Sequence, residues 1–487
     1  MNLHQWYADG YAQDAWRLTS NTTINYGLRY EYMSPLIDVD YTNSNLVITG
    51  GKPQVFIGGQ NGFPRGLMYS NHARFAPRLG LAQSIPHLGI VAHIAYGIFY
   101  TPVDMNTWCN QRHNVPYVFP ETSQSDPYTP SITTLNFPTP VLGTTAVSFT
   151  GLQLHAPPQY IQQWSASLEK QLGSQTTLEV GYLGAGGFHL QRSHLINNAQ
   201  PGPGLIQPRR PFPKISFVAN TVFPAAVAQT MTSSTFPVST MNLLENSAQS
   251  WYDAGYVNIR RRYSNGLSFM GNYTFAKALD NAPDFRSPMF EAATAQNNYD
   301  LNAEKGPACD VRHRFALSTV YDTHAHGQSG FTRALTRDWR GTMVYQVQSG
   351  FPLTISVFGD SANAGTVVGE NPIRANVTGQ KVFGRGTRNS STWFNPGAFA
   401  APPAYAFGNS GRNSVYGPNM QTMDLGLVRG FNLAEKARFE ARAEFFNALN
   451  HTNLGTPNRF VNTSSFGSIT EVSTPGREIQ LSARVSF

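Results

Sequence analysis

The stretch R-E-I-Q-L-S-A-R-V-S-F, residues Arg477 to Phe487, ends the chain and decides how the rest of the sequence is interpreted. Side chains alternate between the two faces of an extended strand, so one face here is apolar and the other polar. The apolar face carries Ile479, Leu481, Ala483, Val485 and Phe487. About ten alternating residues cross a bilayer as a tilted strand. A soluble strand could alternate in the same way, but it would rarely leave a bare aromatic ring at the terminus. We therefore expect the closing strand of an outer-membrane β-barrel.

The composition agrees with a membrane barrel. Of 487 residues, 13% are charged and 12% are aromatic, with 22 Tyr and 31 Phe. So few charges would leave a soluble surface adhesive, whereas a barrel needs an apolar outer band with aromatic girdles. The longest apolar run, residues 89–100, is about a dozen residues and is too short for a spanning helix. A helical membrane protein is therefore excluded.

No motif points to catalysis, a cofactor, a metal or nucleic acid. The net charge is +7, but the 35 Lys and Arg residues are scattered, so no basic stripe for nucleic acid is visible. Gly359-Asp360-Ser361 is the nearest candidate for a nucleophile, and an Asp-Ser pair in a loop usually makes a turn. His324 and His326 are expected in a solvated turn. We expect a protein that is not an enzyme and needs no cofactor or metal.

Strands, short turns and long loops alternate along the chain. Residues 22–32 alternate cleanly, and Ser264-Asn265-Gly266 is a strong hairpin turn between strands predicted at 251–263 and 267–278. Long segments rich in Gly, Asn and Pro follow every second strand and are expected to be irregular. The pattern predicts an all-β, antiparallel transmembrane barrel of about thirteen strands with long extracellular loops.

One predicted strand carries four charges on one face. Its charged residues are Arg438, Glu440, Arg442 and Glu444, and they alternate with Phe439, Ala441, Ala443 and Phe445. A charge facing lipid would cost a few kcal/mol. We expect these four side chains to face a wet lumen or a plug.

An ordered set of short segments resembles a known family. The segments are Y-A-Q-D-A-W from Tyr11, N-Y-G-L-R-Y-E from Asn25, R-F-A-P-R-L-G from Arg74, Y-G-I-F-Y from Tyr96, S-N-G-L-S-F from Ser264, D-V-R-H-R-F from Asp310, S-G-F-P-L-T from Ser349, W-F-N-P-G-A-F from Trp393 and A-E-F-F-N-A-L-N-H from Ala443. Each is weak alone, but the ordered set resembles the TonB-dependent receptor barrels of the Oar-like branch, over nearly the whole chain.

The resemblance implies a barrel of about twenty-two strands around a plug, driven through contact with TonB. No plug, TonB box or signal peptide is visible in this sequence, and closed single-chain barrels have even strand counts whereas about thirteen is odd. We therefore expect residues 1–487 to be the carboxyl-terminal part of such a barrel. The closing strand, ending at Phe487, matches the family's signal for the barrel assembly machinery.

The expected function is movement of a bulky solute across the outer membrane of a Gram-negative bacterium. The expected partners are outer-membrane lipid, the barrel assembly machinery and the TonB complex, which would act through the amino-terminal part. A structural or adhesive surface barrel without transport is one alternative, and an incomplete receptor fragment without function is another. The sequence does not name the solute.

Two features of the predicted loops complete the list of candidates. Cys109 and Cys309 fall in extracellular loops, an oxidising setting, and we predict a disulfide between them; two unrelated thiols are the alternative. Aromatic loop residues could stack on a ligand, although packing within the loops or a place in the girdle is favoured. They are Trp108, Tyr117, Trp393 and Phe394.

Overall fold

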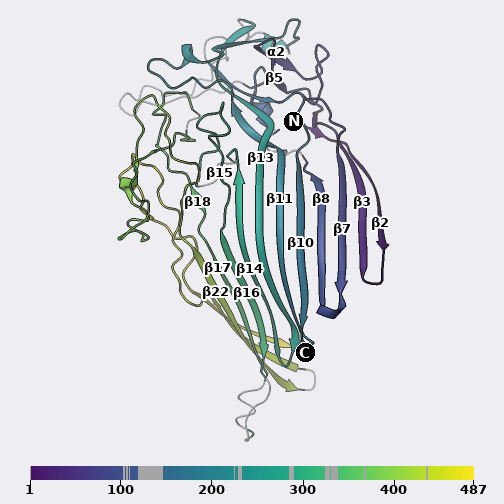
Figure 1. Ribbon diagram of the computed structural model, residues 1–487. Helices are drawn as coiled ribbons and strands as arrows, with labels where there is room; N and C mark the ends of the chain where they lie inside the picture. Colours follow the sequence, from purple (N-terminus) through teal and green to yellow (C-terminus); the bar gives the residue numbers. More distant parts are fainter. Residues whose placement is uncertain are drawn as a thin grey trace.

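Thirteen long strands form one antiparallel wall in the computed structural model (Figure 1). The structure describes residues 2–102, 105, 108, 110–118, 146–223, 225–228, 233–283, 290–323, 330, 338–366, 369–434 and 437–487. The wall strands are β2 (Tyr7–Arg17), β3 (Thr22–Met33), β7 (Phe75–Ile85), β8 (Ile90–Tyr100), β10 (Tyr160–Leu172), β11 (Thr176–Leu195), β13 (Thr235–Ser264), β14 (Leu267–Asp280), β16 (His313–Asp322), β17 (Trp339–Gln348), β22 (Met420–Ala434), β23 (Ala437–Phe446) and β24 (Glu478–Ser486).

Each wall strand pairs antiparallel with the next along the chain, from β2 to β24. The long loops gather at one end of the wall, and the carboxyl terminus lies at the other end (Figure 1). No pairing joins β2 to β24 within the described residues, so closure of the barrel is not observed. The predicted all-β fold with a large antiparallel sheet is confirmed.

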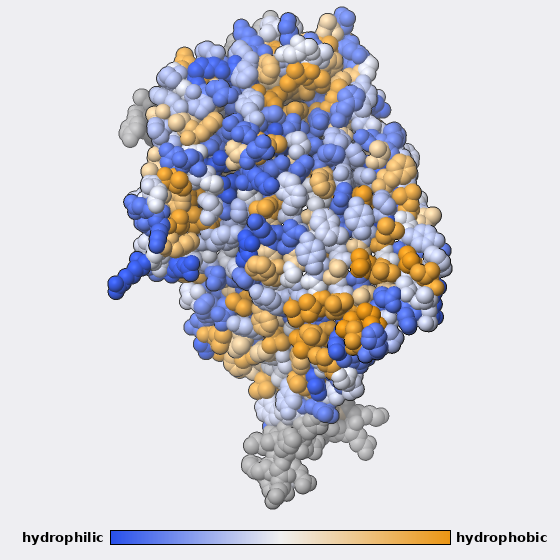
Figure 2. All heavy atoms as spheres, in the orientation of Figure 1, coloured by the Kyte–Doolittle hydropathy of each residue, from blue (hydrophilic) through white to orange (hydrophobic). Residues whose placement is uncertain are grey.

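The register gives the wall two chemically different faces. One row of directly paired residues across six strands is apolar: Leu168, Val180, Val257, Tyr273, Phe315 and Val347. The neighbouring row, one position away on each strand and so on the opposite face, is mostly polar: Glu169, Glu179, Asn258, Asn272, Ala316 and Gln346. We call these the apolar face and the polar face. In Figure 2, apolar side chains gather over the lower part of the strands.

The turn between β13 and β14 shows how the sequence fixes this register. Asn265 and Gly266 both have positive φ, 51° and 79°, and Ser264 pairs with Leu267. Two-residue hairpin turns with positive φ at both positions match the twist of the flanking strands, and Asn-Gly tolerates that conformation best. The predicted Ser-Asn-Gly turn is confirmed.

The long loops are more ordered than the sequence predicts. Residues 235–249 of β13 continue beyond the part that pairs with β14 and pair with two loop strands. The loop strands around them are β5 (Ser44–Thr49), β6 (Lys52–Ile57), β9 (Val147–Leu152) and β12 (Lys214–Phe217). The expectation of irregular loops is therefore wrong for these segments. Strands distant in sequence supply part of their hydrogen bonds, since β9 pairs with β13 and β6 with β12, while β5 and β6 form a local hairpin.

The remaining elements are short. The strands are β1 (Leu3–His4), β4 (Ile37–Asp38), β15 (Gly306–Pro307), β18 (Pro352–Leu353), β19 (Asn376–Val377), β20 (Phe399–Ala400) and β21 (Val415–Tyr416). The helical turns are η1 (Pro86–Leu88), η2 (Asn110–His113), η3 (Gln207–Arg209), α2 (Ala225–Ala228) and η4 (Pro396–Ala398). Among the described residues, no helix is long and apolar enough to cross a membrane.

Two large apolar cores and two smaller ones lie within the described residues of the long loops. The first loop core consists of Leu46, Val55, Val115, Val147, Phe149, Ile196, Ile215, Phe217, Phe236, Val238 and Met241. The second loop core consists of Leu353, Ile355, Ala375, Phe394, Ala398, Phe399 and Val415. Burial of such side chains contributes about 1.5–3 kcal/mol each, which offsets the entropy lost when a loop becomes ordered.

The assignment of the two faces predicts that substitutions at two neighbouring positions in the middle of β16 affect stability differently. Leu317 lies on the apolar face and Ser318 on the polar face. We expect Leu317→Arg to lower the free energy of unfolding in lipid vesicles by about 2–4 kcal/mol, because it would place a charge in hydrocarbon. Ser318→Arg should change it little. Chemical unfolding followed by tryptophan fluorescence measures both, and equal losses would contradict the assignment of the faces.

Candidate functional site

The four charges predicted on one strand face do share the polar face of β23. Glu444 and Arg442 pair directly with Gly426 and Val428 of β22, which pair in turn with Thr342 and Arg340 of β17. Thr342 and Arg340 lie an even number of residues from Gln346 and therefore on the same face of β17. Arg442 lies between two carboxylates, with nitrogen-to-oxygen distances of 3.4 Å to Glu440 and 3.5 Å to Glu444. The alternating signs therefore offset one another along the strand. Whether this face meets a lumen or a plug stays a prediction.

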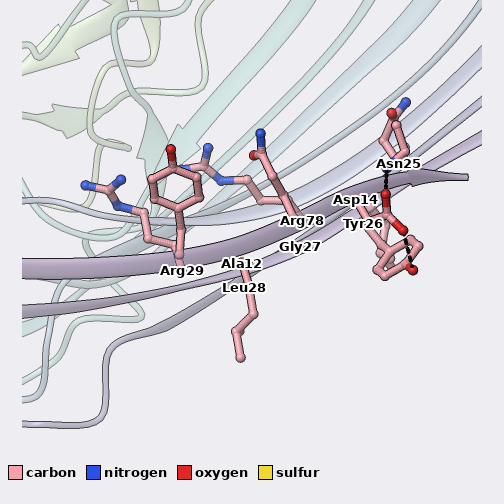
Figure 3. A pocket seen from close by; sticks show the side chains of 13 residues that line it. Ala12, Asp14, Asn25, Tyr26, Gly27, Leu28, Arg29 and Arg78 are labelled. Carbon is pink, nitrogen blue, oxygen red and sulfur yellow. Dashed lines mark hydrogen bonds between the residues drawn. The ribbon is translucent and has the colours of Figure 1, made fainter.

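A second charged group lies on the polar face at β2, β3 and β7. Arg29 binds Asp9 at 2.7 Å and Glu31 at 2.8 Å, and the Arg78 guanidinium lies 4.8 Å from the centre of the Phe99 ring. Of these residues, Arg29 and Arg78 border a hollow of about 640 Å³. Figure 3 shows Arg29 and Arg78 on one side of the strands and Leu28 on the other. This part of the wall thus presents polar and cationic groups on one face.

Glycine keeps that hollow open. A Cβ atom on Gly27 would lie 2.9 Å from the carbonyl oxygen of Ala12 and 2.9 Å from Cβ of Gln13. Real Cβ atoms essentially never approach so closely. The N-Y-G-L-R-Y-E segment therefore needs its glycine for close strand approach, and the polar face stays hollow there.

Buried ion pairs hold the long loops to the wall. Arg412 binds the carboxylate of Glu291 at 2.7 Å, also pairs with Asp280 at the end of β14, and donates from Nε to the carbonyl oxygen of Glu304 at 2.8 Å. Arg374 binds the Glu304 carboxylate at 2.8 Å. Burial lowers the pKa of Arg412 to about 10 and raises the pKa of Glu304.

The D-V-R-H-R-F segment has a structural role in the same region. One carboxylate oxygen of Asp310 accepts a hydrogen bond from the Ala278 N–H at 2.8 Å. The other accepts from Tyr416 Oη at 2.5 Å and from Arg312 at 2.8 Å. Asp310 therefore joins the end of β14 to the loop strand β21.

Residues 199–204 and 360–366 form a second contact between loops, which we call the loop latch. Ala199 donates to the carbonyl oxygen of Ala364 at 2.9 Å, and the side-chain amide of Asn363 donates to the carbonyl oxygens of Gly202 and Gly204 at 2.8 Å each. The latch joins the loop that carries Ile196 of the first loop core to the loop that holds the second.

The loop aromatics that could have met a ligand are mostly inside the loops. Trp108 is 1% exposed and Phe394 is 0% exposed, while the Trp393 indole N–H donates to the carbonyl oxygen of Tyr416 at 2.9 Å. Tyr117 is half-buried. Packing, the favoured interpretation, accounts for Trp108, Trp393 and Phe394.

Three further residues, Asp360, His324 and His326, are assigned to turns from the sequence. Asp360 accepts backbone N–H bonds from Ala364 and Gly365, as expected for a turn residue. His324 and His326 lie outside the described residues. Within the described residues, no group of three or more His, Cys, Asp or Glu side chains could hold a metal ion.

The predicted disulfide stays a prediction. Cys309 is exposed at the long-loop end of the wall, but Cys109 lies outside the residues that the structure describes.

Sequence reasoning missed the ion pairs of Arg412 and Arg374. Single charged residues in a loop usually remain in solvent, so nothing local marks these as buried. The loops concerned carry several other charged residues, such as Asp360, Glu370, Lys381 and Arg388, so the sequence does not single out the paired ones.

The wall is a large antiparallel sheet of the kind found in outer-membrane barrels, with one face suited to lipid and one suited to water. The chain matches the family described as "Outer membrane beta barrel domain" over residues 1–480 and belongs to it. It is therefore a protein of the Gram-negative outer membrane. A search of curated proteins gives no match to the sequence.

Solved structures of similar arrangement include receptors and transporters of the outer membrane. The siderophore receptor PirA from Acinetobacter baumannii is 10% identical with a TM-score of 0.45, and 99% of this chain covers 46% of that one. The transporter YddB from Escherichia coli is 9% identical with a TM-score of 0.48, and the match covers 99% of this chain and 54% of YddB. The ferripyoverdine receptor of Pseudomonas aeruginosa is 9% identical with a TM-score of 0.45, and the match covers 99% of this chain and 39% of the receptor. The chain thus spans about half or less of their length.

Removing Arg412 should loosen the loops. We expect Arg412→Met to leave the Glu291 carboxylate buried without its ion-pair partner and to lower the free energy of local opening by about 3–5 kcal/mol. Limited trypsin digestion in detergent micelles should then cut the loops faster. The control Arg340→Met breaks an exposed pair with Asp322 and should cost at most about 1 kcal/mol. Unchanged digestion of Arg412→Met would contradict a clamping role.

The lowered pKa of Glu245, which lies on the part of β13 beyond the wall, predicts that the stability of the fold depends on pH. Burial by itself would raise the pKa of Glu245, but hydrogen bonds from His194 and Ser247 and the charge of Arg192 outweigh it and lower the pKa to about 2. Because this lies below the ordinary value of 4.5, ionised Glu245 stabilises the fold above that pH, and the stabilisation is lost as the pH falls toward 2.

The thermal midpoint of Glu245→Gln should therefore lie below that of the native protein at pH 7. The difference should shrink between pH 5 and pH 2, measured by differential scanning calorimetry. Glu478→Gln, at an exposed position at the start of β24, is the matched control and should show no such trend. A difference that stays constant down to pH 2 would contradict the lowered pKa.

Proposed function

We propose that residues 1–487 form the carboxyl-terminal part of the barrel of a TonB-dependent receptor that moves a bulky solute across the outer membrane. The observation that carries this proposal is the polar face, which continues across the wall and bears charged groups from β2 to β23. A barrel that only anchored a protein in lipid would gain nothing from such a face unless water or a polar domain filled the interior. Membership of the outer-membrane barrel family supports the proposal.

In this proposal the chain carries out no chemistry. The strands satisfy their backbone hydrogen bonds within the sheet, which the hydrocarbon core requires. The polar faces of β23 and of β2, β3 and β7 hold a plug in place, with Arg438, Glu440, Arg442 and Glu444 among the contacts. TonB acts on the amino-terminal part of the longer protein, and the solute passes when the plug moves.

The apolar face of the closing strand has a second partner in this proposal. Ile479, Leu481, Ala483 and Val485 pair opposite Phe445, Ala443, Ala441 and Phe439, which places them on the apolar face. Phe487 is 99% exposed. These residues, together with the edge of β24 that has no strand partner among the described residues, are the features that the barrel assembly machinery would bind before the strand meets lipid.

An adhesive surface barrel is the second candidate. The observation that favours it is the order within the long loops, which have two apolar cores and buried ion pairs. A rigid outer surface suits attachment to other cells or matrix. The two candidates differ in whether the polar face responds to energy supplied by TonB.

Cysteine labelling separates the candidates. In the full-length protein with Cys109 and Cys309 changed to Ser, we expect Arg442→Cys to react with a water-soluble maleimide faster in energised cells than after addition of a protonophore. Plug movement would expose the polar face. Ala443→Cys, on the apolar face, should react slowly in both conditions. Labelling of Arg442→Cys that is insensitive to the protonophore would reject TonB-driven transport and favour the adhesive barrel.

A further inference from the structure

A hollow of about 420 Å³ lies where β17 ends and β22 begins, beside the last long loop. Its volume falls within the range of small-molecule sites, which are apolar with a few polar groups. The apolar side chains around it come from three loops and the start of β22. They are Phe290, Phe351, Leu353, Met420, Leu454 and Val472.

Close backbone contacts fix the shape of this hollow. A Cβ atom on Gly350 would lie 2.1 Å from the carbonyl oxygen of Gly417, and one on Gly455 would lie 2.6 Å from Cγ of Glu471. Gly350 therefore cannot be enlarged without moving the backbone, and enlarging Gly455 would displace the Glu471 side chain. Asn453 anchors the last loop to β22, since its side chain exchanges two hydrogen bonds with the Gln421 backbone at 2.7 and 2.9 Å.

An aromatic pair forms one side of the hollow. The rings of Phe290 and Phe351 are stacked with their centres 5.8 Å apart and their planes 3° from parallel. Phe351 remains 44% exposed, so part of it can contact a ligand. The face of an aromatic ring attracts a cation through its quadrupole, and its area attracts apolar groups.

Glu471 is the one charged residue in the lining. Its carbonyl oxygen accepts the Gly455 N–H at 2.9 Å, which fixes its backbone. Within the described part of the chain, no basic side chain pairs with its carboxylate. Among the described residues, no Lys or Arg lines the hollow, although the chain carries a net charge of +7. Charge therefore disfavours an anion, and a single carboxylate is too few ligands for a metal ion such as Ca²⁺.

We propose that this hollow binds an organic cation that carries an aromatic or apolar group. The ammonium group would pair with Glu471, and the apolar part would lie against Phe351 and Val472. The site goes beyond the proposed transport function and does not require it, because binding is measured without a plug or TonB.

Three related indoles test the proposal. Tryptamine is a cation, 3-ethylindole is a neutral analogue and indole-3-propionate is an anion of similar size. Isothermal titration calorimetry at pH 7 with the full chain in detergent micelles should show saturable tryptamine binding. An ion pair with an exposed carboxylate is worth a factor of a few, so the neutral analogue should bind about three- to fivefold more weakly. The anion should not bind.

Variants assign the contact to this hollow. Glu471→Gln should lower the affinity for tryptamine about three- to fivefold and leave 3-ethylindole unchanged. Phe351→Ala should weaken both, and Glu478→Gln, at an exposed position on β24, should change neither. Glu471 is exposed, so its substitution should leave the fold intact, as circular dichroism would show. No saturable tryptamine binding, equal binding of the three indoles, or unchanged binding by Glu471→Gln would each overturn the proposal.

Discussion

The hydrogen-bond ladder of the wall is the interaction on which the rest of the structure depends. In hydrocarbon no water can bind a free N–H or C=O group, so each spanning strand must have partners on both sides. The ladder fixes the register, and the register fixes which side chains share a face. The row from Leu168 to Val347 and the row from Glu169 to Gln346 are therefore consequences of the same backbone bonds.

The wall was largely predictable from the sequence because its signals are local. The strand predicted at 267–278 is β14, which continues to Asp280, and the closing strand differs from expectation only at its ends. Alternation of apolar and polar residues with a two-residue turn is enough to define a hairpin. The partner of each strand follows because it is the next strand in the chain.

The loops were not predictable to the same degree, because their partners are distant. The outer part of β13 was expected to be irregular, because it contains Pro237 and several polar residues. It is a strand, and its partners include β9, some ninety positions away. Glu291 and Arg412 meet across 121 positions, and neither segment alone marks them as buried. What lies inside the loops is set by long-range pairing that periodicity does not record.

The loop latch has a consequence for the order of folding. Asn363 and Gly202 are 161 positions apart, and β13, β14, β16 and β17 lie between them in the chain. Bringing such distant residues together costs loop-closure entropy that shrinks once the intervening strands are paired. The latch should therefore form late, after the wall has taken its register. A protease that fails to cut the latched loops would then report that the strands beneath them are already correctly aligned.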